Sequence, residues 1–182
     1  LCPEIYYRKR GQTVNETAAK YIDVLDELFT QSFAKQYGDW CREHGIKFTG
    51  HILHEDNLSI QTSLSGSMMR FYEYMDYPGI DNLSAHNGCF WAAIQCASVA
   101  RQLGKKFVLS ELYGCTGWDM PLSEYKRIGD WHALFGINLR CPHLSWYTMK
   151  GEAKRDYPTS ILHQNAWYKD WKLLEEYYGR IG

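Results

Sequence analysis

Two glutamates follow strand-like segments of the 182-residue sequence and could act together as acid–base groups. Glu111 comes directly after the apolar segment 107–110, and Glu55 follows the segment 46–53. Enzymes built from alternating strands and helices carry their chemistry at the carboxyl ends of the strands. Hydrolysis of a glycosidic bond needs one carboxylic acid for the leaving oxygen and a second carboxylate as base or nucleophile. A strand-end ion pair for Glu111 and a solvated loop for Glu55 are the structural alternatives.

Two histidines lie near the same predicted strand ends. Side chains alternate along a strand, so His51 faces the same side as Glu55, whereas His54 points away. We therefore expect His51 and His143 to contact a substrate. A metal site built from His51, His143 and a carboxylate stays open as an alternative, although the sequence has no H-E-x-x-H motif.

Aromatic residues make up 15% of the chain, with 7 Trp and 14 Tyr, more than a core of this size needs. Flat apolar ring faces suit the C–H faces of sugars, and their polar edges donate hydrogen bonds. Anchoring of a loop into the core is the alternative for each ring, and Asp119 is equally suited to cap a helix. The substrate-binding residues expected on the long loops after the strands are Tyr113, Trp118, Asp119, Trp146 and Tyr147.

Alternating strand and helix patterns must position these side chains. Strand patterns recur about every 30 residues, as in a (β/α)₈ barrel of ~250 residues. The expected strands are 46–53, 79–84, 107–110 and 137–144, and the expected helices are 66–75, 90–103, 122–135 and 164–178, after a helical region at 15–44.

The predicted fold class is α/β, of the TIM-barrel type, with about half a barrel in this segment. We expect a helical lead-in at 1–44 and four βα units at 45–182. A doubly wound open sheet shares the same alternation, but no G-x-G-x-x-G or P-loop follows any strand. Half a barrel cannot close its own sheet, and the chain begins with Leu1, so we expect a piece of a longer protein. The expected partner is the missing half of the barrel or another copy of the chain.

Composition argues against two classes of partner. Lys and Arg number 20 against 21 Asp and Glu, which leaves no basic footprint for nucleic acid. The longest apolar stretch, 89–100, is too short to cross a bilayer. The six cysteines contain no C-x-x-C pair, so a zinc ribbon or thioredoxin-like redox site is not expected.

Two runs of residues resemble a known family. They are Ser110-Glu111-Leu112-Tyr113-Gly114 with Gly117-Trp118-Asp119, and the later run His143-Leu144-Ser145-Trp146-Tyr147. Together they resemble the C-terminal barrel half of glycoside hydrolase family 106, the α-L-rhamnosidases. The resemblance implies a catalytic TIM barrel inside a large carbohydrate-active enzyme, located outside the cytoplasm. It also implies an inverting route, with Glu111 as the base and Glu55 as the acid, and a bound calcium whose ligands have no motif here.

The sequence thus predicts a glycosidase that removes a terminal, rhamnoside-like sugar by two-carboxylate catalysis. Two other functions stay open. The first is a non-catalytic sugar-binding or structural barrel fragment, and the second is a metal-dependent hydrolase that uses His51 and His143.

Overall fold

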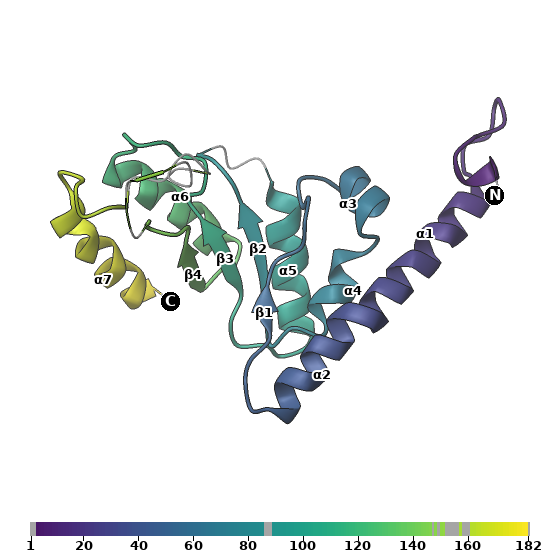
Figure 1. Cartoon of the computed structure of the whole chain (residues 1–182), viewed down its shortest axis with the longest axis horizontal. Coiled ribbons are helices and arrows are strands. Elements are labelled where there is room, and N and C mark those ends of the chain that lie inside the picture. The colour runs from purple at the N-terminus through teal and green to yellow at the C-terminus, as the bar shows by residue number, and fades with distance from the viewer. Residues whose placement is uncertain are drawn as a thin grey trace.

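Four parallel strands form one curled sheet with the outline of half a barrel (Figure 1). The computed structural model describes residues 3–85, 89–146, 148, 150–151, 157 and 161–181. The strands follow one another in chain order across the sheet, as successive units of a barrel do, whereas a doubly wound sheet reverses its order part-way. They are β1 Thr49–Gly50, β2 Tyr77–Asn82, β3 Leu109–Leu112 and β4 Leu139–Pro142.

Helices connect the strands and cover the outer face of the sheet. A continuous helical rod precedes β1 and consists of α1 Glu16–Phe29, the π-helical η2 Thr30–Lys35 and α2 Gln36–Glu43 (Figure 1). No helix in the described part of the chain is both long and apolar enough to span a membrane. The other helices are η1 Pro3–Ile5, α3 Leu58–Leu64, α4 Met68–Tyr72, α5 Phe90–Gln102, α6 Leu122–Leu134, η4 Tyr168–Asp170 and α7 Trp171–Ile181.

The predicted alternation of strands and helices is confirmed, but the bounds of several elements differ, and the last helix begins at 171 instead of 164. Three of the differences concern the strand ends that carry the predicted site. The first strand has two residues, because Gly50 and His54 take positive φ angles of 148° and 60° that interrupt extended backbone. The segment expected as a long polar loop after it contains α3, which begins where the Asn57 side chain accepts a hydrogen bond from the Ile60 N–H. The third strand begins two residues later than predicted, so Glu111 lies inside β3.

A buried histidine joins the helical layer to the sheet. His132 on α6 donates from Nδ1 to the Ile128 carbonyl at 2.7 Å, which leaves Nε2 to accept from the Asn82 amide on β2 at 3.3 Å. Burial lowers the pKa of His132 to about 4, because the charged ring cannot be solvated there. Trp171 on α7 and Trp167, in the turn before η4, pack against the core next to α6.

Close approach of β1 and β2 requires a glycine at position 79. A Cβ on Gly79 would lie 2.3 Å from the Gly50 carbonyl oxygen, which is backbone and cannot rotate away. We expect Gly79→Ala to destabilise the fold by about 2 kcal/mol or more, as overpacking does. Gly179→Ala, on exposed α7 with open space around its Cβ, should be neutral or stabilising. Urea unfolding of both variants tests this, and equal midpoints would contradict the predicted contact.

Candidate functional site

Each strand contributes one titratable side chain to the carboxyl end of the sheet. His51 follows β1, Asp81 lies in β2, Glu111 in β3, and His143 follows β4. The His51 Nε2 atom lies 3.3 Å from Glu111 Oε2 and 3.8 Å from Asp81 Oδ2. His143 Nε2 approaches the other oxygen of Glu111 at 3.9 Å. The structure therefore brings together the predicted residues His51, Glu111 and His143.

Asp81 belongs to this cluster, although the sequence prediction did not include it. Asp81 and Glu111 are register partners on adjacent parallel strands, so their carboxylates lie side by side on the inner face. Burial first, and the neighbouring Glu111 charge second, raise the pKa of Asp81 to about 6. Among the described residues, no group donates a hydrogen bond to the buried Asp81 Oδ1 atom. The position of Asp81 at the end of an apolar strand was a signal, but the register that pairs it with Glu111 is a tertiary property.

Glu55 lies deeper than the other acids, with 4% of its surface exposed. Its Oε1 atom accepts hydrogen bonds from the Tyr72 hydroxyl at 3.0 Å and the Ile52 N–H at 3.3 Å. Its Oε2 atom accepts from the Asp81 N–H at 2.7 Å. Burial outweighs these bonds and raises the pKa of Glu55 to about 7. Glu55 therefore contacts the backbone of Asp81, whereas Glu111 is the strand partner of Asp81.

A cavity of about 430 Å³ opens beside Glu55 and Asp81, within the size range of small-molecule sites, and Glu111 and His143 do not line it. His51, Glu55, Asp81, Cys89 and Tyr157 are among the residues that line it. This cavity is the candidate site, because it combines enclosed space with the perturbed carboxyl groups.

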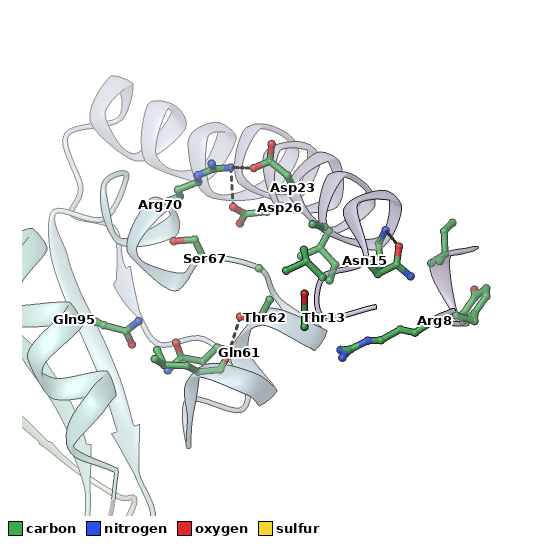
Figure 2. A pocket seen from close by; sticks show the side chains of 18 residues that line it. Arg8, Thr13, Asn15, Asp23, Asp26, Gln61, Thr62, Ser67, Arg70 and Gln95 are labelled. Atoms are coloured by element: carbon green, nitrogen blue, oxygen red, sulfur yellow. Dashed lines mark hydrogen bonds and ion pairs between the residues drawn. The ribbon is translucent and has the colours of Figure 1, made fainter. Parts of the chain in front are cut away.

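A larger cavity of about 810 Å³ lies away from the strand ends, between α1 and the helices α3 and α4 (Figure 2). Arg70 on α4 pairs there with Asp23 and the buried Asp26 at 3.0 and 2.9 Å. These ion pairs hold the helical rod against α4, so we assign this region a structural role.

The predicted aromatic residues have different surroundings. Trp118 and Trp146 lie together, with ring centroids 5.0 Å apart and an interplanar angle of 30°, and Trp118 is 41% exposed. Tyr113 is 1% exposed and packs edge-on against Tyr125 and Trp171, which contradicts its prediction as a sugar-binding loop residue. The chain turns through a positive φ of 76° at Tyr113, where its ring belongs to the core beside α6 and α7.

Two further predicted positions add less to the site. Asp119 is exposed, and its alternative role as a helix cap is wrong, because Pro121 occupies the N-cap position of α6. Tyr147 lies outside the described residues.

The described residues do not fit calcium, the ion that the family resemblance implies. One atom from each of His51, Asp81 and Glu111 lies within 4.8 Å of the others, which is close enough for a shared ion. Calcium takes six to eight oxygen ligands, however, and this cluster offers two carboxylates and an imidazole nitrogen. An imidazole between two carboxylates is also explained by ion pairing and hydrogen bonding alone. His143 lies on the far oxygen of Glu111, so the predicted His51–His143 ligand pair is not the arrangement found.

Among comparisons with known proteins, a structural one finds a similar fold. No protein-family model matches the sequence, and no curated protein matches it. A solved structure of a rhamnosidase from Novosphingobium sp. PP1Y is similar, with a TM-score of 0.75 and 20% sequence identity. The similarity covers 90% of this chain and 16% of the rhamnosidase chain. The chain therefore has the fold of one part of a much longer protein.

The raised pKa of Glu55 makes a testable contribution to stability. The folded state holds a proton on Glu55 up to about pH 7, whereas the unfolded chain releases it near 4.5. Stability from this group is therefore present at low pH and falls as pH rises through that window. Relative to Glu55→Gln, the wild type should lose about 2 kcal/mol between pH 5 and pH 8.

Chemical unfolding of both proteins at the two pH values measures this difference. The comparison cancels the opposite contribution of His132, which both proteins share. A difference that stays constant across the pH range would show that Glu55 is ionised in the fold.

Proposed function

We propose that this chain carries the acid–base pair of a glycoside hydrolase that removes a terminal, rhamnoside-like sugar from a glycoside. One observation carries the proposal. Two carboxyl groups at the same end of the sheet have contrasting surroundings, and such contrasts separate the acid from the base. Glu55 is buried with a pKa of about 7, whereas the Glu111 side chain is 27% exposed between two histidines. Similarity to part of a rhamnosidase supports the same conclusion.

In this proposal Glu55 acts as the general acid. A carboxyl that stays protonated near neutral pH can donate its proton to the leaving glycosidic oxygen. Glu111 acts as the base that removes a proton from the attacking water. His51 and His143 contact opposite oxygens of Glu111 and would hold the carboxylate in place while substrate hydroxyls bind beside it.

The strand order favours inversion of the anomeric centre. Glu55 follows β1 and Glu111 lies in β3, with β2 between them. Adjacent strands are ~4.8 Å apart, so the backbones of β1 and β3 lie about 9–10 Å apart. An inverting pair needs ~6.5–9.5 Å between its carboxyl groups, and a retaining pair ~5–5.5 Å.

A complete cleft in this proposal needs further strands. Within the described residues, β1 and β4 each have a free edge, and an eight-stranded barrel has none. The missing half of the barrel or another copy of the chain would supply the opposite wall of the sugar site.

The proposed role of Glu111 as the base predicts different kcat values for two matched Glu→Gln variants. Glu111→Gln should lower kcat on aryl α-L-rhamnosides by about 10²-fold or more, because it removes the base. Glu124→Gln, which alters an exposed ion pair with Arg127 on α6, should leave kcat unchanged. Sugar binding without turnover in both the wild type and Glu111→Gln would favour the non-catalytic sugar-binding alternative, and unchanged turnover in Glu111→Gln would remove Glu111 as the base.

The stereochemical course gives an independent prediction. NMR of the first-formed sugar should show an inverted anomeric configuration. A retained configuration would replace Glu55 with Asp81 as the partner of Glu111, since those two carboxylates approach each other directly across adjacent strands.

The tryptophan pair predicts where the sugar ring binds. Trp118→Ala should weaken saccharide binding about tenfold or less, because one aromatic face contributes on the order of 1 kcal/mol. Trp40→Ala removes another exposed ring, on α2 and away from the strand ends, and should not change binding. Calorimetric titration with L-rhamnose compares the two variants. Equal affinities would make Trp118 and Trp146 loop anchors only.

A further inference from the structure

Five hydrogen bonds from five parts of the chain converge on one residue, Glu55. Besides the three bonds to its carboxyl group, its backbone carbonyl accepts from the Gln61 amide on α3 and from the Cys89 thiol that precedes α5, both at 3.0 Å. The preceding residue, His54, takes the left-handed φ of 60° that turns the chain inward. The backbone and side chain of Glu55 are therefore both fixed.

The carboxyl oxygens have unequal numbers of donors. Each oxygen offers two acceptor positions. The Tyr72 hydroxyl and the Ile52 N–H occupy both positions of Oε1, whereas the Asp81 N–H occupies one position of Oε2. A proton on Oε1 would displace the hydrogen bond that the Tyr72 hydroxyl donates, so among the described donors the free position for a proton lies on Oε2.

Tyr72 is the only described side chain that donates to this carboxyl group. It is fully buried, and burial keeps its pKa well above the usual value, so its hydroxyl remains a donor at all working pH values. Its ring lies in the core cluster with residues of α4 and α5, which fixes the hydroxyl against Glu55.

We infer that Tyr72 is a positioning residue for the general acid: its hydroxyl occupies Glu55 Oε1 and so directs the transferable proton to Oε2. This inference rests on the proposed function. Tyr72 does not touch the substrate, and it acts through Glu55 alone. Removal of the Tyr72 hydroxyl should lower the rate most on substrates whose leaving group needs protonation.

Leaving-group dependence tests this role. We expect Tyr72→Phe to lower kcat/KM on phenyl α-L-rhamnoside at least tenfold, with less than a threefold change on the 2,4-dinitrophenyl glycoside, whose leaving group departs without a proton. Glu55→Gln should show the same pattern with a larger loss. Tyr74→Phe, whose hydroxyl accepts a hydrogen bond from Gln31 instead, should change neither rate. The ratio of the two rates does not depend on how much protein is folded.

A second variant leaves the buried Tyr72 ring unchanged. Glu55→Asp withdraws the carboxyl from the Tyr72 hydroxyl by one methylene, leaves Tyr72 packing intact, and should reproduce the selective loss if Tyr72→Phe does not fold. Equal losses on both substrates in Tyr72→Phe would overturn the positioning role and leave the proposed function intact. Absence of hydrolysis of both glycosides by the wild-type protein with its barrel completed would overturn both.

Discussion

The parallel register between β2 and β3 is the constraint on which the candidate site depends. It sets Asp81 directly beside Glu111, so two carboxylates share one face of the sheet. Like charges at this distance repel, and the pKa of Asp81 is raised partly for this reason. His51 and His143, which reach Glu111 from the two outer strands, offset that repulsion. A shift of one residue in this pairing would send either carboxylate to the helix-packed face.

The acids of the candidate site differ in how deeply they are buried. Glu111 stays partly solvated at the strand ends, whereas Glu55 is enclosed by β2 and by the helices α3, α4 and α5. An uncompensated buried carboxylate costs several kcal/mol, and the fold reduces this cost by three donors and by keeping a proton on Glu55 up to about pH 7. The same burial that stabilises the protonated form gives the site a group able to release a proton at neutral pH.

Among the described residues, the sheet is open at both edges, β1 and β4. Its inner face and both edges carry the features of half a barrel, and the similar rhamnosidase has this fold as 16% of its chain. The buried histidine His132 joins α6 to β2, and the ion pairs of Arg70 join α4 to α1, without using the inner face. The helical layer is thus built within this segment, while β1 and β4 keep edges without a partner strand among the described residues.

The sequence alone determined the alternation of strands and helices and the position of Glu111 near the carboxyl end of its strand, because periodicity and turn residues act locally. The predicted alternation of His51 and Glu55 along one strand is wrong, because β1 ends at Gly50 and the chain turns at His54. The sequence did not reveal α3, since a capped seven-residue helix looks like polar loop without its contacts. Only the tertiary structure decided that Tyr113 enters the core and that Asp81 pairs with Glu111. It also decided that Tyr72, 17 residues beyond Glu55, donates to its carboxyl group. Register between strands and packing between distant helices join residues far apart in the chain, and no local pattern encodes such contacts.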